Sequence, residues 1–285
     1  MVMQTNSDHC AALVREADRD RYLATLFAPA DRRAALFSLY AFNVEIVRVR
    51  DVAREPMPGE IRLQWWREVL SGEREGEGAA NPVAASLMAS LKQYAISPER
   101  LAAIVDARTS DLYDDPLQTL DDLDNYAVMT QSALIDIAAD MLGADRSETM
   151  MLIRSSGIAY TVAGILSGLS RHAARGQLYI PLEVLERHGV TREDILARQV
   201  NEPLKAALAE LRRHARRQLA AARADMAFAP AAILPALLPV ALVGPVLRPM
   251  DRRGYEPFNV PPLSLLRRQW LLWRAARDPQ RIFSV

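Results

Sequence analysis

The sequence predicts an all-α protein. Apolar residues recur at helical spacing almost throughout the 285-residue chain, and no stretch shows sustained two-residue alternation rich in Val, Ile and Thr. Helix start signals also recur, because a capping residue precedes a proline at Asn81-Pro82 and at Ser97-Pro98. Thr119 and Thr191 each begin a variant of the capping box. We therefore expect a bundle of helices.

The expected helices follow from these start signals and from the apolar period. In chain order they cover residues 8–27, 30–53, 58–71, 82–94, 98–108, 120–142, 146–170, 181–187, 192–198, 203–225, 229–247 and 262–276. Residues 1–7 are expected to form a flexible tail, and the charged runs 72–78 and 248–257 are expected to be solvated loops. Neither loop divides the chain and no internal repeat is evident, so we expect one domain over residues 1–285.

The composition is that of a globular protein long enough to bury a large core, with 50% hydrophobic and 25% charged residues. Acidic and basic residues balance at 35 each, so no bulk field favours nucleic acid as a partner. Arginine supplies nearly all the positive charge, which codon bias explains more simply than anion recognition. Cys10 is the only cysteine, which excludes an internal disulfide and a cysteine-based zinc site.

The N-terminus has no basic region followed by an apolar core, so we expect no secretory signal and a cytoplasmic protein. One segment leaves peripheral contact with the inner membrane open, because Met226 to Leu247 carries no charged residue and is long enough to span a bilayer. Four prolines interrupt it. We interpret it as kinked core helices, with a membrane span as the alternative, since transmembrane helices tolerate proline.

The segment from Gly157 to Pro181 resembles the second Asp-rich motif of the squalene/phytoene synthase family. In that family the motif's carboxylates, four residues apart on one helix face, hold Mg²⁺ against a prenyl diphosphate. The matching framework residues are Gly157, Ala159, Ile165, Leu166, Arg175, Gly176, Tyr179 and Pro181. The two aspartate positions fall on Gly168 and His172. Glycine offers no metal ligand, and we interpret His172 as an ordinary polar helix residue rather than a ligand.

The segment from Tyr40 to Asp51 resembles the family's first Asp-rich motif in the same incomplete way. Ala41, Phe42 and Asp51 match, but the first two aspartates fall on Val47 and Arg48. Arg48 places a positive charge where Mg²⁺ would bind, which opposes metal binding. Two interpretations stay open: the arginines of this segment form the solvated side of an amphipathic helix, or they hold a diphosphate without metal.

The resemblance covers nearly the whole chain. The segments Asn43–Glu45, Ile61–Trp66 and Tyr126–Leu134, together with Gln269-Trp270, look closer to one branch of the family, the assembly factors of mitochondrial respiratory complex I. Both branches imply the all-α isoprenoid-synthase fold, a helical bundle around a central apolar cavity. On this basis we expect the segments 40–51 and 157–172 to face each other across the cavity.

Two functions stay open. The resemblance favours a non-catalytic protein that acts in complex I assembly, or that binds a prenyl lipid, with no cofactor. The alternative is a head-to-head prenyltransferase that uses farnesyl or geranylgeranyl diphosphate with Mg²⁺ in isoprenoid biosynthesis. The expected partners are a respiratory complex subunit or a prenyl lipid, with peripheral membrane contact and no nucleic acid.

The candidate site is an anion or diphosphate pocket at the cavity mouth. It consists of Arg48, Asp51, Arg171, His172, Arg175 and Tyr179. Guanidinium groups at helical spacing hold anions through charge-assisted hydrogen bonds. The acidic cluster at residues 121–124 is instead explained by a helix N-terminus. The four tryptophans, Trp65, Trp66, Trp270 and Trp273, lie beside leucines at helical spacing and are expected in the core.

Overall fold

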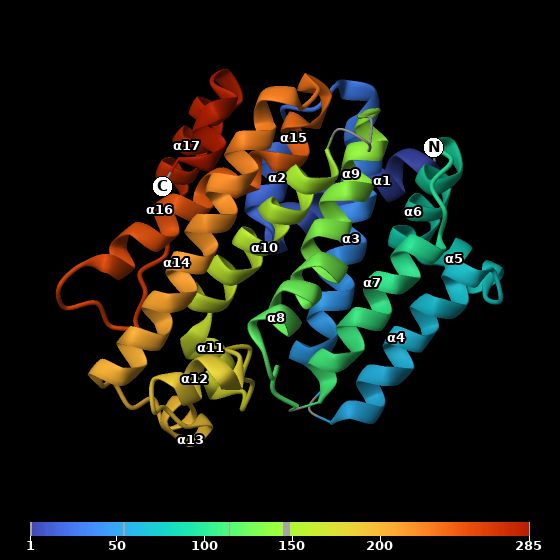
Figure 1. Cartoon of the computed structure of the whole chain (residues 1–285). Coiled ribbons are helices and arrows are strands. Elements are labelled where there is room, and N and C mark those ends of the chain that lie inside the picture. Colours follow the sequence, from blue (N-terminus) through green and yellow to red (C-terminus); the bar gives the residue numbers. More distant parts are fainter. Residues whose placement is uncertain (1, 54, 114, 145–148, 285) are drawn as a thin grey trace. The chain divides into compact units, whose positions relative to one another are not determined.

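Helices make up the computed structural model, which describes residues 2–53, 55–113, 115–144 and 149–284 (Figure 1). No strand occurs in these ranges, which confirms the all-α prediction. The chain divides into two compact units. Unit 1 contains the described residues of Met1–Tyr113, Ala133–Glu148 and Pro230–Leu238, and unit 2 those of Asp114–Ser132, Thr149–Ala229 and Pro239–Val285. The expectation of one domain stays a prediction.

Unit 1 is built around a long helix, α3, whose middle is almost completely buried. Its helices α1, α6 and α9 pack against α3, and α4 packs against α7. The elements are α1 (Val2–Ala17), α2 (Arg19–Thr25), α3 (Ala30–Val52), α4 (Pro56–Ser71), α5 (Glu75–Ala80), α6 (Pro82–Gln93), α7 (Glu99–Thr109), η1 (Ser110–Leu112), α9 (Ala133–Leu142), η4 (Ala231–Ile233) and α15 (Leu234–Leu237).

Unit 2 is built around the packed pair α10 and α14. Helix α14 carries many charged residues, but leucines and alanines at helical spacing form one apolar side that is buried. This apolar side explains why α14 packs in the core of the unit. The elements are α8 (Leu120–Ala127), the π-helix η2 (Val128–Ser132), α10 (Met150–Ser167), α11 (Leu169–Ala174), α12 (Leu182–Arg187), α13 (Arg192–Leu196), α14 (Glu202–Asp225), η3 (Met226–Phe228), α16 (Val243–Leu247), η6 (Arg248–Asp251), α17 (Leu265–Arg277) and η7 (Pro279–Phe283), with η5 (Leu238–Leu242) beginning at the unit boundary.

Three of the four predicted capping residues, Asn81, Thr119 and Thr191, start helices as expected. The fourth prediction is wrong, because Pro98 and not Ser97 holds the N-cap position of α7, without a side-chain hydrogen bond. Asn81 accepts hydrogen bonds from the backbone of Val83 and Ala84 at the start of α6. Thr119 and Thr191 both form complete capping boxes, at α8 and α13. These local signals were sufficient because a cap satisfies backbone donors within its own turn.

Several predicted boundaries are wrong. The expected helix 8–27 is two helices, because the Asp18 side chain caps α2 and ends α1 before it. Helix α1 begins at Val2 and so includes residues 2–7, which were expected to be a tail. Within the expected loop 72–78, α5 begins at Glu75. The start of the expected helix 146–170 lies outside the described residues, and α10 ends at Ser167.

The apolar segment expected to form kinked core helices does so. It is broken into short helical pieces from Ala231 to Asp251, and Ile233 and most of its leucines and valines are buried, whereas Leu234 and Val246 are half-buried. By length and composition alone, Ala231–Asp251 and Met150–Ser167 are apolar enough to cross a membrane, with 72% and 67% of their windows buried. Such burial is typical of core helices of a globular protein.

Candidate functional site

The second motif lies in unit 2, where Gly157 allows a close helix contact. A Cβ at Gly157 would lie 2.6 Å from the backbone nitrogen and 2.7 Å from the Cα of Ser132. Ser132 ends the π-helix η2, and its hydroxyl donates to the carbonyl of Arg154 on α10 at 3.1 Å. Only glycine fits this crossing, so the framework glycine of the motif has a packing role here.

Gly168 and His172, which stand at the two aspartate positions of this motif, contact each other. Gly168 lies between α10 and α11, and the amide of His172 donates to its carbonyl at 3.0 Å. A Cβ at Gly168 would lie 2.7 Å from Cε1 and 3.0 Å from Nε2 of His172. The imidazole therefore occupies the space that a side chain at position 168 would need.

His172 is held as a neutral, largely buried ring. Its ring centroid lies 5.0 Å from that of Tyr179 in an edge-to-face arrangement, and Tyr179 in turn lies 6.0 Å from the ring of Tyr126. The Nδ1 atom is buried and makes no hydrogen bond. Burial, with the positive charges of Arg171 and Arg175, lowers the pKa of His172 from 6.5 to about 4.

This pKa predicts a pH-dependent stability. In the folded protein His172 stays neutral down to a pKa of about 4, whereas in the unfolded chain it takes up a proton near pH 6.5. Protonation of His172 therefore does not affect folding well above pH 6.5. As the pH falls from 6.5 towards 4, protons bind the unfolded chain preferentially, and the free energy of unfolding falls. Between pH 7 and pH 5 the loss attributable to His172 is about 2 kcal/mol. Urea unfolding of wild type and His172→Gln at both pH values measures it, and equal pH slopes would contradict it.

Further arginines surround the end of this motif. Arg192 donates to the carbonyl of Gly176 at 3.3 Å, and Arg198 donates to the carbonyl of Ser170 at 3.0 Å. Both come from the α13 region, which packs against α11. The two motifs do not identify these arginines, because both residues lie outside the motifs and reach this region only through the fold.

The first motif lies at the C-terminal end of α3 in unit 1. Its inward residues, including Ala41 and Phe42, are core, whereas Val47, Arg48 and Asp51 are exposed. Burial raises the pKa of Glu45, and the nearby charges of Arg48 and Arg62 partly oppose that increase. This end of α3 thus shows the amphipathic character that the sequence analysis kept open.

The predicted site residues are placed as two sets. In unit 2, Arg171, His172, Arg175 and Tyr179 lie together, as the ring contact and the charge effects on His172 show. Arg48 and Asp51 belong to unit 1. It stays a prediction that the two sets converge at one pocket. It also stays a prediction that segments 40–51 and 157–172 face each other.

The residues at the motif positions do not fit Mg²⁺. This ion requires oxygen ligands in near-octahedral geometry. Val47 and Gly168 supply none, and Arg48 adds a positive charge. The space over Gly168 is taken by an imidazole beside two arginines. Among the described residues, no group of three or more His, Cys, Asp or Glu side chains is arranged to hold a metal ion.

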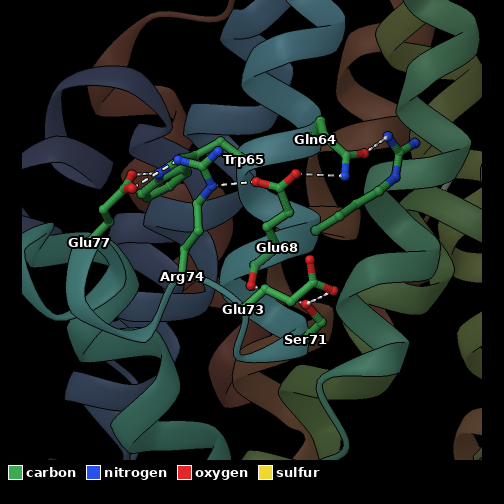
Figure 2. Close-up of polar contacts among 8 residues, drawn as sticks. Gln64, Trp65, Glu68, Ser71, Glu73, Arg74 and Glu77 are labelled. Carbon is green, nitrogen blue, oxygen red and sulfur yellow. Dashed lines mark hydrogen bonds and ion pairs between the residues drawn. The ribbon is translucent and has the colours of Figure 1, made fainter.

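A separate groove of about 450 Å³ lies on the surface of unit 1, between α4 and α7. Figure 2 shows its polar contacts: Trp65 donates to Glu77 at 3.0 Å, Arg74 bridges Glu68 and Glu77, and Gln64 donates to Glu68 at 3.0 Å. The hydrogen bond from Gln64 and the guanidinium of Arg74 lower the pKa of Glu68. These groups pair with one another, so the network attaches α5 to α4.

Comparisons with known proteins agree with the sequence resemblance. The Squalene/phytoene synthase family model matches residues 14–274. NADH dehydrogenase (ubiquinone) complex I, assembly factor 6, of Homo sapiens is 28% identical over 254 residues, which cover 89% of this chain and 76% of the human protein. Presqualene diphosphate synthase of Rhodopseudomonas palustris is 29% identical over 178 residues, which cover 61% of this chain and 62% of that enzyme.

Solved structures show the same fold. A squalene synthase from Alicyclobacillus acidocaldarius superposes with a TM-score of 0.76 at 22% identity, over 90% of this chain and 97% of that one. A dehydrosqualene synthase solved with a ligand gives a TM-score of 0.81 at 15% identity, over 98% of both chains. The predicted isoprenoid-synthase fold is confirmed.

Proposed function

The chain belongs to the squalene/phytoene synthase family, and we propose that it is a non-catalytic member that acts in the assembly of respiratory complex I. The observation that carries the proposal is the coupled replacement at Gly168 and His172, where an imidazole fills the space of a family carboxylate. The relatives named complex I assembly factor 6 support it, since their similarity covers 89% to 92% of this chain in the human and mouse proteins.

The chain keeps the fold of the family but not the residues that would bind the metal ions. The packing positions of the second motif retain their residues and their contacts, as at Gly157. The carboxylates that would hold Mg²⁺ against a leaving diphosphate are absent from four motif positions, Val47, Arg48, Gly168 and His172. A protein that serves as a binding body needs the core and a surface but not these ligands.

Deletion of the gene in the organism that carries it tests the function. We expect NADH dehydrogenase activity of complex I to fall severalfold and partly assembled subcomplexes to accumulate on native gels, because a step of assembly is lost. Squalene and carotenoid levels should not change, since no prenyl transfer is removed. Normal complex I with depleted isoprenoids would favour the prenyltransferase instead.

A prenyl lipid is the second candidate partner, and the arginines around His172 are the observation that favours it. Calorimetric titration with farnesyl diphosphate in the presence of a chelator should show binding that Arg175→Ala weakens about tenfold or more, because a charge-assisted hydrogen bond contributes about 1.5 to 3 kcal/mol. Arg213→Ala, an exposed arginine of α14, is the matched control. Absence of binding in wild type would leave protein recognition alone.

A further inference from the structure

Helix α17, red in Figure 1, presents an apolar face to solvent. Leu266, Trp270 and Trp273 are 78%, 51% and 45% exposed. At about 100° per residue these three side chains fall within about 60° of one another on the helix circumference. Leu272 and Ala275, on the other side, are buried and attach the helix to unit 2. The expectation that Trp270 and Trp273 lie in the core is therefore wrong, whereas Trp66 is buried as expected.

The charges that α17 itself carries beside this apolar face have one sign. The 13 residues of α17 include four arginines, at positions 267, 268, 274 and 277, and no carboxylate. The guanidinium of Arg274 lies 4.5 Å from the ring centroid of Trp270, and that of Arg277 lies 4.0 Å from the ring of Trp273. The next residue, Asp278, is engaged by Arg281 at 2.6 Å. Cations and indoles are thus interleaved on one exposed surface.

We propose that this surface, formed by Leu266, Trp270, Trp273, Arg274 and Arg277 and termed the Trp-Arg face, binds bilayers that contain anionic phospholipids. Indole rings favour the boundary between headgroups and acyl chains, and arginines beside them bind phosphate groups. A helix of this length extends only about 20 Å, so it would lie in the interface and not cross a core of about 30 Å.

Charge complementarity favours a bilayer over a protein partner as the occupant. The whole chain has no net charge, so attraction to an anionic surface must come from a local cluster such as this one. A surface that carries two arginines and no carboxylate matches a uniformly anionic plane of headgroups. A protein interface would instead present carboxylates to pair with individual arginines. The proposal does not depend on the function proposed above.

Flotation of the full-length protein with vesicles tests the proposal. Wild type should bind vesicles of phosphatidylcholine with about 30% phosphatidylglycerol and bind pure phosphatidylcholine much more weakly, and raising the salt from about 0.1 to about 0.5 M should reduce binding. The variant Arg274→Gln/Arg277→Gln should lose about 25-fold in affinity, at about fivefold per arginine. The variant Trp270→Ser/Trp273→Ser should lose about tenfold or more.

Two matched controls separate the face from general surface effects. Arg213→Gln/Arg223→Gln changes the net charge equally but alters exposed residues of α14. Met57→Ala/Ile61→Ala removes two exposed apolar side chains of α4. Both should bind vesicles like wild type. Circular dichroism should be unchanged in every variant, because all the altered side chains are at least partly exposed.

Three outcomes would overturn the proposal. Equal binding to vesicles with and without phosphatidylglycerol would remove the anionic headgroup as the ligand. Unchanged binding by the tryptophan variant would place the membrane contact elsewhere. A wild-type protein that floats with neither vesicle would leave the Trp-Arg face as a surface for a protein partner.

Discussion

Replacing Gly157 by alanine is expected to lower the free energy of unfolding by about 3 kcal/mol or more. The new methyl group would meet the backbone nitrogen of Ser132 at 2.6 Å and its Cα at 2.7 Å. These are main-chain atoms of the π-helix η2, so the clash is relieved only by separating η2 from α10. Thermal unfolding should show a midpoint lower by about 5 °C or more.

Gly164 provides the matched control on the same helix. It is exposed, and a Cβ there would meet nothing within 4 Å. Alanine at an exposed helix interior is favoured over glycine by about 1 kcal/mol, so Gly164→Ala should raise stability slightly. Equal destabilisation by the two substitutions would show that the close approach at Gly157 is not what requires glycine.

The elements that could be predicted from the sequence are those fixed by local interactions. The capping boxes at Thr119 and Thr191 form as expected because the side chain and the backbone groups it satisfies lie within one turn. The proline-broken segment after Met226 is also predictable, since proline removes a helical hydrogen bond wherever the segment packs.

The features that could not be predicted depend on tertiary contacts. The expected helix 120–142 contains a π-helical stretch at Val128–Ser132, which packs against α10 at Gly157. Trp270 and Trp273 repeat at the same helical spacing that buried residues use, and periodicity does not state which face of a helix is covered. The buried face of α17 is the one that contains Leu272 and Ala275, and only tertiary packing determines this choice.

The candidate site was predictable in its residues but not in their arrangement. The sequence shows that Gly168 and His172 replace two carboxylates. It does not show that the imidazole fills the space over the glycine, nor that burial beside two arginines lowers the pKa of His172. Those properties depend on a side-chain orientation and on neighbours distant in the sequence, such as Tyr126.

The largest expected effect concerns catalysis. Purified protein with farnesyl diphosphate and Mg²⁺ should release diphosphate no faster than buffer does, measured by a coupled phosphate assay. Ionisation of a prenyl diphosphate leaves a highly charged group, and loss of the metal ions that stabilise it costs many powers of ten in rate. An active presqualene diphosphate synthase in the same assay is the positive control.

Restoring the ligands should restore metal binding. The variant Val47→Asp/Arg48→Asp/Gly168→Asp/His172→Asp supplies oxygen donors at all four motif positions and removes the arginine and the ring that oppose them. Mn²⁺, a paramagnetic substitute for Mg²⁺, should bind this variant and not wild type in electron paramagnetic resonance titrations. His172→Asp alone is the matched control, because a single carboxylate beside Arg171 and Arg175 gains no partner.

Positions 168 and 172 should also couple in stability. Gly168→Asp by itself brings a side chain against the His172 ring, whereas the same change with His172→Asp meets no ring, so the double variant should be more stable than the single changes predict. Such coupling would distinguish a site whose space is filled by the His172 ring from a site that only lacks metal ligands. Rapid Mg²⁺-dependent diphosphate release by the wild-type protein would contradict the non-catalytic function, because it would require metal binding without the four carboxylates.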